Sequence, residues 1–223
     1  MNISNGKIRR LRSYCEITMK VPFEGTILSV KARIRLIRSF DQIPTHQYQG
    51  YSLVMSGKVG DAARDFKIAI GPKAHEKHRF RIGDVVSGEG EAVPDPNTEW
   101  GEFYKISGLE VHKRGPSPDD APPGPDGGIA PALEVYRANG HRRLDRDTWA
   151  RNCAACPWGL NMVTEIIVDH WNPDRKKYRF ETHCYGPKDC PRYNPGKPYR
   201  VPGRSAGMVY VDDDVERSSQ PFR

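Results

Sequence analysis

The chain has 223 residues, and its 35 lysine and arginine residues outnumber its 28 aspartate and glutamate residues, giving a formal net charge of +7. No window approaches the roughly 18 apolar residues of a membrane-spanning helix, and the basic N-terminus lacks the apolar stretch of a secretion signal, so we expect a cytoplasmic protein with no membrane partner. A hydrophobic fraction of 37% favours two small domains with modest cores, and the positive charge favours a polyanionic partner such as nucleic acid.

Short β-strands are predicted along the first half of the chain. In residues 27–40, apolar and basic side chains alternate with the period of two that places them on opposite faces of a strand. The alternation slips at Ile37, which predicts a bulge or a bend there. The apolar face of this strand carries Leu28, Val30, Ala32, Ile34 and Leu36. Further strands are predicted at 49–60, 65–71, 81–93 and 103–113, with a helical turn at 72–80.

The last two of these strands, RFRIGDVVSGEGEAV (79–93) and FYKISGLEVHK (103–113), resemble the closing strands of an OB-fold, in which a Gly-Asp turn opens the fourth strand. The resemblance covers about residues 20–114. It implies a five-stranded OB-like Greek-key barrel that binds single-stranded nucleic acid or oligosaccharide across its second and third strands. The fold class expected from the sequence is therefore mainly β, with this barrel followed by a small zinc-ribbon-like β-hairpin domain.

Residues 115–132 are dominated by Pro, Gly and Asp and show no apolar periodicity. This composition predicts a linker between a barrel domain with a basic N-terminal arm (1–114) and a second domain (133–223). The second domain is expected to begin with a strand, a turn at Asn139 and Gly140, and a short helix. It is expected to end in an acidic, exposed tail.

Four cysteines in the second domain follow the spacing of a metal site, C-x2-C, a gap of 27 residues and C-x5-C. A tight C-x2-C loop lets two thiolates face one ion, and a second pair across a hairpin completes the tetrahedron that Zn²⁺ prefers. The intervening residues 161–171 and 177–185 are rich in β-branched and alternating residues and predict that hairpin. The predicted ligands are Cys153, Cys156, Cys184 and Cys190.

The CAACPWG knuckle and the following hairpin resemble zinc ribbons, although CYGPKDC is longer than the usual second knuckle. The resemblance implies one structural Zn²⁺ ion. An iron–sulfur cluster is the alternative, because four thiolates also hold such clusters. His183, next to a predicted ligand in a strand, is expected to point away from the metal and lie on the surface, and Cys15 is expected to be an inert structural thiol.

Binding of single-stranded nucleic acid needs cations that follow the phosphates and aromatic faces on which bases stack. On the barrel, the candidates are Lys31, Arg33, Arg35, Lys58, Lys67 and Tyr51. Among other aromatic residues, Phe66 shares the phase of Ile68 and Ile70 and is expected in the core. The predicted hairpin adds a basic rim made of Arg175, Lys176, Lys177 and Arg179. Trp158 and Trp171 either cover the metal or stack on a base, and covering is favoured.

The sequence favours a non-enzymatic nucleic-acid-binding protein, but two alternatives of other classes stay open. The cysteine pairs and the strand ending in VDH resemble HNH endonucleases, and this resemblance implies that Asp169 and His170 hold a metal ion and activate water. The residues that separate His170 from Cys184 depart from the usual HNH pattern. A scaffold for acyl-CoA or another small molecule is the second alternative, because one acyl-CoA-associated family also combines a ribbon with an OB-fold, in the reverse order.

Overall fold

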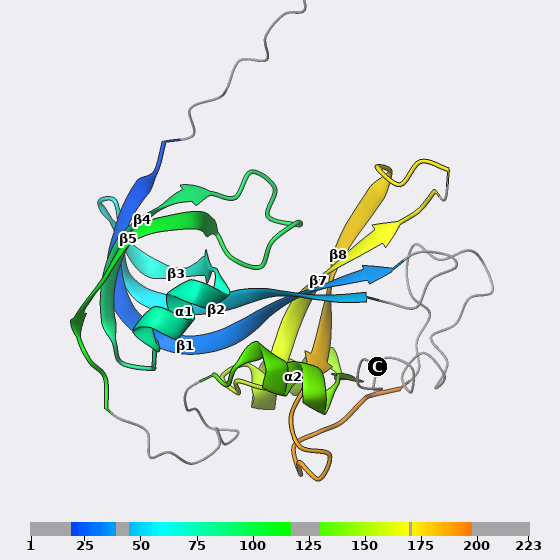
Figure 1. Cartoon of the computed structure of the whole chain (residues 1–223). Coiled ribbons are helices and arrows are strands. Elements are labelled where there is room, and N and C mark those ends of the chain that lie inside the picture. Colours follow the sequence, from blue (N-terminus) through cyan, green and yellow to red (C-terminus); the bar gives the residue numbers. More distant parts are fainter. Residues whose placement is uncertain (1–18, 39–44, 117–129, 170, 198–223) are drawn as a thin grey trace, which may run out of the picture.

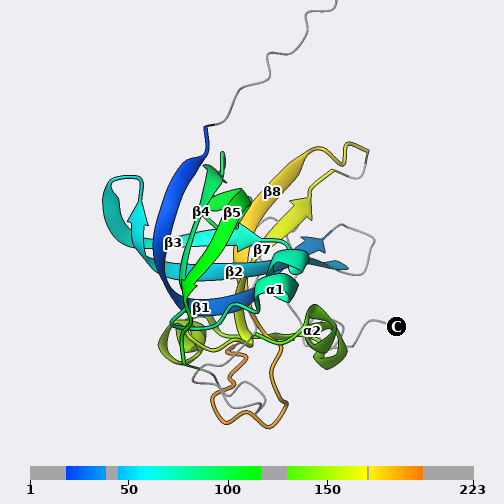
Figure 2. The same ribbon diagram turned by 60° about the vertical axis from the view of Figure 1, so that its left-hand side comes forward.

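The computed structural model describes residues 19–38, 45–116, 130–169 and 171–197. These residues are mainly β, as predicted, and Figures 1 and 2 show a strongly curved sheet with a hairpin projecting from one side. No helix in these ranges is long and apolar enough to cross a membrane.

The strands of the first half lie where the sequence predicts them, and the predicted helical turn is also confirmed. The elements of this half are β1 (Val21–Arg38), β2 (Thr45–Val59), β3 (Ala62–Ile70), α1 (Pro72–His78), β4 (Val85–Ala92) and β5 (Phe103–Lys113). The second half contains α2 (Leu133–Asn139), β6 (Arg142–Arg143), α3 (Arg146–Thr148), the π-helical turn η1 (Trp149–Cys153), β7 (Gly159–Ile167) and β8 (Lys176–Cys184).

The strands β1 to β5 form a closed ring. β1 pairs antiparallel with both β2 and β4, β2 pairs with β3, and β4 pairs with β5. A short parallel contact between Ile68 of β3 and Phe103 of β5 closes the ring. Its interior is filled by alternate apolar side chains, among them Leu53 and Phe66. The expected core position of Phe66 is thus confirmed.

The bulges in β1 and β2 lie elsewhere than the sequence suggests. Register with β2 shifts at Leu28, which is the extra residue between Ile27 and Ser29, while Ile37 stays paired with Thr45. The extra residue of a bulge turns its side chain away from the face of its neighbours, so Leu28 is 45% exposed instead of lying in the core. The prediction of a bulge at Ile37 was therefore wrong.

A second shift places one extra residue, Gln49, in β2. It is followed by Gly50, whose φ of 132° is a conformation that side chains strongly disfavour. A Cβ atom there would also come within 2.2 Å of the Ile70 carbonyl oxygen. Glycine is therefore required where β2 bends around the edge of the ring.

The sheet continues beyond the ring because β1 has a third partner. Its last residues, 35–38, pair in parallel with residues 163–166 of β7. β7 forms an antiparallel hairpin with β8, as predicted, and β6 adds two residues to the outer side of β8. The full strand order is β2-β3-β5-β4-β1-β7-β8-β6, with β2 also paired to β1. The N-terminal and C-terminal halves therefore share one sheet.

The predicted strand at the start of the second half is a helix instead. Residues Leu133–Asn139 form α2, and the side chains that it buries are Leu133 and Tyr136. Their spacing of three residues suits one face of a helix, and it outweighs the β-propensity of Val135 and Tyr136. Tyr136 is fully buried and its hydroxyl donates to the Pro157 carbonyl at 3.0 Å, which holds α2 against the cysteine loop.

One buried cluster of apolar side chains runs through both halves, from Phe23 in β1 to Tyr185 after β8. Tyr51 of β2 adds a direct link, because its hydroxyl donates to the Pro131 carbonyl at 2.9 Å. Most of the predicted linker, residues 117–129, lies outside the described residues, as do Cys15 and the acidic tail. The division into two domains stays a prediction, and the described residues show a shared sheet and a shared core.

Leu36→Ala tests whether this core acts as one unit. Leu36 is fully buried where β1 pairs with both His46 and Thr164, so the cavity should lower the free energy of unfolding by about 2–5 kcal/mol. We expect a single urea transition in which tryptophan fluorescence and far-ultraviolet circular dichroism shift together. The exposed Leu28→Ala variant is the control and should change stability by less than about 0.5 kcal/mol. Separate transitions for the two probes would contradict a shared core.

Candidate functional site

The four predicted metal ligands lie around one pocket of about 240 Å³. Cys153 ends the turn η1, and Cys156 lies in the next turn, where its backbone N–H donates to the Cys153 carbonyl at 3.1 Å. Cys184 ends β8 and pairs across the hairpin with Gly159, and Cys190 follows in a loop. The hairpin thus brings together two cysteine pairs that are far apart in the sequence.

Local backbone geometry favours this arrangement of thiols. A Cβ atom on Gly159 would come within 2.7 Å of the Cys153 carbonyl oxygen, so only glycine lets β7 begin so close to the first knuckle. The backbone N–H of Gly186 donates to the Cys184 sulfur at 3.4 Å, and Arg142 lies 3.8 Å from the same sulfur. Such donors stabilise a thiolate over a thiol.

Burial works in the other direction. It raises the pKa of Cys153 to about 11, with a smaller contribution from the three neighbouring thiols, and it also raises the pKa of Cys184. An ion would have to displace the protons. As the side chains lie, no group of three or more His, Cys, Asp or Glu residues in the described ranges is arranged so that it could hold a metal ion. The donor set therefore fits zinc in its chemistry, and the four thiols share a pocket without converging on one point.

Lys31 lies inside the protein and not on a basic face. It is 3% exposed, and its ammonium group donates to the backbone carbonyls of Gly159 at 2.8 Å and Cys153 at 3.3 Å. Burial lowers its pKa to about 8. The alternation in β1 predicted a solvent-facing cation, but the cysteine knuckle packs on that face. Lys31 joins β1 to the cysteine loop and has no free surface for a phosphate.

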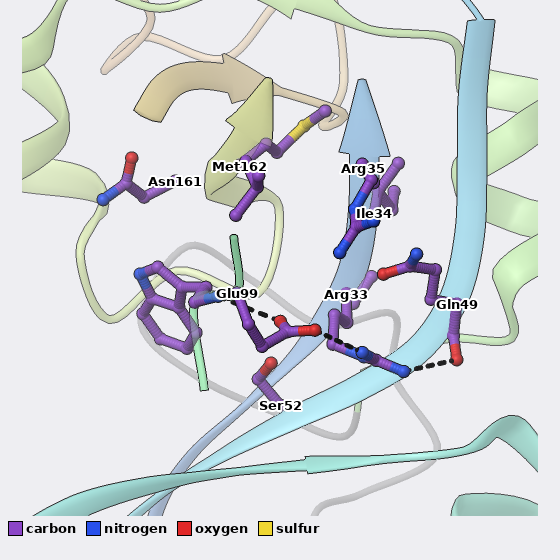
Figure 3. Close-up of a pocket in the computed structure, with 11 residues that line it drawn as sticks. Arg33, Ile34, Arg35, Gln49, Ser52, Glu99, Asn161 and Met162 are labelled. Carbon is purple, nitrogen blue, oxygen red and sulfur yellow. Dashed lines mark hydrogen bonds and ion pairs between the residues drawn. The ribbon is translucent and has the colours of Figure 1, made fainter. Parts of the chain in front are cut away.

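Arg33 and Arg35 are covered by the loop between β4 and β5. Arg33 lies 2.6 Å from the Glu99 carboxylate and donates to the Gln49 carbonyl at 3.1 Å, as Figure 3 shows. Arg35 donates to the Thr98 carbonyl at 2.8 Å and lies 3.6 Å from a Glu165 oxygen. The pocket beside them has a volume of only about 20 Å³, so both guanidinium groups are engaged within the protein.

Tyr51 is also a core residue. Its ring packs on His75 with a centroid distance of 4.0 Å, and burial raises its pKa to about 12. The two remaining candidates on the ring are nearer to solvent, because Lys58 is exposed and Lys67 is half-buried. The ammonium group of Lys67 lies 5.0 Å from the centroid of the Trp100 ring. Trp100 comes from the loop between β4 and β5, and the sequence did not single it out.

The hairpin cations differ in how strongly they are engaged. Lys176 lies 2.8 Å from Glu165, and Arg179 pairs with Glu181. Lys177 is exposed, and Arg175 is largely exposed at 3.9 Å from Asp169. The accessible part of the predicted basic rim is therefore the hairpin turn.

The two tryptophans near the ends of the hairpin differ in their exposure to solvent. Trp158 is buried and lines the cysteine pocket, whereas Trp171 is 91% exposed at the turn. Covering of the metal site is thus possible for Trp158 alone. For the nuclease alternative, the Asp169 carboxylate accepts from the backbone N–H of Trp171 at 3.0 Å, and His170 lies outside the described residues.

Sequence reasoning missed a buried histidine cluster where the ring meets the hairpin. His46 and His141 stack with a centroid distance of 3.6 Å, and His183 lies 5.5 Å from His141. The His46 Nδ1 atom is 2.7 Å from the Tyr185 hydroxyl. His183 is fully buried, so its expected surface position was wrong. The alternation in β8 placed it correctly opposite Cys184, but that side of the strand faces the interior.

A buried ion pair lies next to this cluster. Arg38, the last residue of β1, is 3.0 Å from Glu181 of β8, and both side chains are almost inaccessible. Burial would raise the pKa of Glu181, but the guanidinium groups of Arg38 and Arg179 outweigh it and hold that pKa at about 2. The pair is therefore charged and bridges the two halves.

No protein-family model, no curated protein and no solved structure matches this chain.

The histidine cluster predicts loss of stability in mild acid. Burial, together with His183 and Arg38, lowers the pKa of His46 to about 3 despite an opposing effect of Glu181, and burial also lowers the pKa of His141. An unfolded histidine takes up a proton near pH 6.5. The free energy of unfolding should therefore be constant above pH 6.5 as far as these histidines are concerned. At lower pH it should decrease by on the order of 1 kcal/mol per histidine for each pH unit.

Urea titrations between pH 7.5 and pH 5.5 would measure this slope. His46→Gln and His141→Gln should each reduce it, whatever they do to stability at pH 7.5. The same substitution at the exposed His112 is the control. An unchanged slope in both cluster variants would contradict the assignment.

Proposed function

We propose that this chain is a non-enzymatic protein that binds single-stranded nucleic acid through an OB-like barrel, with a zinc-ribbon-like hairpin packed against it. The ring order β1-β2-β3-β5-β4, its parallel closure between β3 and β5, and the position of α1 between β3 and β4 support the OB-like assignment. The proposal also includes a cytoplasmic location and a polyanionic partner, which the net charge of +7 supports.

The observation that carries the proposal is the pair formed by Lys67 and Trp100 on the outside of the ring. A cation held over an indole face combines the two elements that single-strand binding uses, a charge for phosphate and a flat surface for a base. Lys58 on the neighbouring strand β2 adds an exposed charge. Arg33 and Arg35, in contrast, are engaged by carboxylates within the protein.

The hairpin turn would extend this surface. Arg175 and Lys177 are exposed there, and the nearly fully exposed Trp171 offers a second aromatic face. Contacts of this kind hold the phosphate backbone without reading sequence. Binding should therefore be strongly salt-dependent and weakly selective.

The zinc-ribbon part of the proposal assigns Cys153, Cys156, Cys184 and Cys190 as ligands of one structural Zn²⁺. Their common pocket, the Gly186 N–H that faces the Cys184 sulfur and the spacing of the two pairs support this assignment. When bound, the ion would cross-link the two cysteine pairs and would have a structural, not a catalytic, role. Lys31, which already holds the carbonyls of the first knuckle, would transmit that constraint to β1.

Cys156→Ser tests the metal assignment. The purified protein should contain about one zinc per chain by elemental analysis, and the variant should lose the ion and unfold at lower urea. Burial, with a smaller contribution from the neighbouring thiols, raises the pKa of Cys153 to about 11 without any ion. Slow alkylation of the thiols would therefore not report the ion, so metal content is the readout. Cys15→Ser is the matched control and should keep the zinc. Visible absorbance with bound iron would instead establish a cluster, and no metal of either kind would exclude the site.

The nucleic-acid interface is tested by fluorescence anisotropy with labelled single-stranded DNA and RNA at two salt concentrations. Trp100→Ala should weaken binding by about 1–3 kcal/mol, the contribution of one stacked base. Lys58→Ala combined with Lys67→Ala should lower affinity and reduce the salt slope by about 1 for each lysine that binds a phosphate. Lys73→Ala on the exposed side of α1 is the control. No binding by the parent protein would refute the proposal.

A further inference from the structure

One edge of the sheet is open along most of β8. β7 covers β8 from Lys176 to Cys184 on one side. On the other side β6 pairs only with His183 and Cys184, and the Leu144 N–H donates to the Thr182 carbonyl at 3.0 Å. In the described part of the chain, no strand pairs with residues 176–181 on that side. A further strand can add at this edge.

The open edge of β8 carries an apolar side chain near one end and basic side chains at the other. Backbone groups alternate along a strand, so the direction of the Thr182 carbonyl places those of Phe180 and Tyr178 on the same open side. The Phe180 side chain is 38% exposed, and Arg175, Lys176 and Lys177 follow toward the hairpin turn. Lysines on an edge oppose pairing with another basic strand. They favour a strand that is apolar at one end and acidic at the other.

The described part of the chain ends near β6, at one end of this edge. The carbonyls of Gly196 and Lys197 accept hydrogen bonds from the Arg143 guanidinium at 3.0 and 2.9 Å, and Arg143 is the β6 residue opposite His183. The last described residue therefore lies beside the closed end of the β8 edge. The 11 residues 198–208 reach up to about 40 Å, whereas the six open residues of β8 span only about 20 Å.

Residues 209–215 have a sequence that complements the apolar and basic parts of the β8 edge. Residues 209–215 read VYVDDDV, three strand-forming residues followed by three aspartates. An antiparallel strand that starts near His183 would place Val209–Val211 beside Phe180 and Tyr178. It would then place Asp212–Asp214 beside the basic residues 175–177, where opposite charges on neighbouring strands stabilise pairing.

We propose that the acidic C-terminal segment 209–215 docks on the open edge of β8 as an additional antiparallel strand. The occupant is this segment of the same chain, and the strand addition satisfies backbone groups that are otherwise exposed. One consequence rests on the proposed function: the docked aspartates cover Arg175–Lys177 and compete with nucleic acid for the hairpin turn.

Amide hydrogen exchange tests the docking, in full-length protein whose zinc content has been measured. In the full chain, the Tyr178 and Phe180 amides should exchange about tenfold more slowly than in a chain that ends at Ala206. Asp212→Asn, Asp213→Asn and Asp214→Asn together should lose part of this protection. The matched control neutralises three exposed carboxylates elsewhere, with Asp61→Asn, Glu76→Gln and Glu110→Gln, and should keep it. Amides of β7 should be unaffected throughout.

Equal exchange in the full and shortened chains would overturn the proposal. So would protection that survives shortening and grows with protein concentration, because a second copy would then occupy the edge. Equal loss in the control variant would also overturn it, as a general charge effect. Binding of a labelled 20-nucleotide single strand is measured separately, and the shortened chain should bind about tenfold more tightly at low salt. If neither form binds, the proposed function fails while the exchange result still decides the docking.

Discussion

Strand β1 carries the constraint on which the rest of the structure depends. Its first residues pair with β4, most of its length pairs with β2, and its last four residues pair with β7. A strand has only two edges, so three partners require a long strand on which β4 and β7 pair with different stretches. The bulge at Leu28 bends this strand. The orientation of the hairpin relative to the ring is therefore fixed by backbone hydrogen bonds.

The region between the ring and the hairpin is unusually polar for an interior. It contains the Lys31 ammonium group, the ion pair of Arg38 and Glu181, and the histidines 46, 141 and 183. Buried charges lose hydration and recover it only through well-placed partners. Lys31 donates hydrogen bonds to the Cys153 and Gly159 carbonyls, and Arg38 forms an ion pair with Glu181. These contacts favour the observed arrangement of the two halves, because separating the partners would leave buried charges uncompensated.

This shared interior also changes which surfaces remain for a ligand. Of the cations on β1, Lys31, Arg35 and Arg38 contact the C-terminal half, and Arg33 is engaged within the ring. Charge that reaches solvent is left on β2, on β3 at the half-buried lysine beside Trp100, and at the hairpin turn. Alternation in β1 correctly indicated that Arg33 and Arg35 point out of the ring. It could not reveal that the Glu99 loop and β7 cover that face, because those contacts join residues more than 60 positions apart.

Local patterns in the chain were enough to locate the strands of the ring, the turn of α1, the β7–β8 hairpin and the gathering of four cysteines around one pocket. Those features follow from alternation, turn residues and short spacings, which act within a few residues. The burial of Lys31, Tyr51 and His183 and the helical conformation of α2 were settled by packing between distant segments. The reason is physical: a strand has two faces, and alternation separates them without telling which face, or whether both, will be covered by a distant part of the chain.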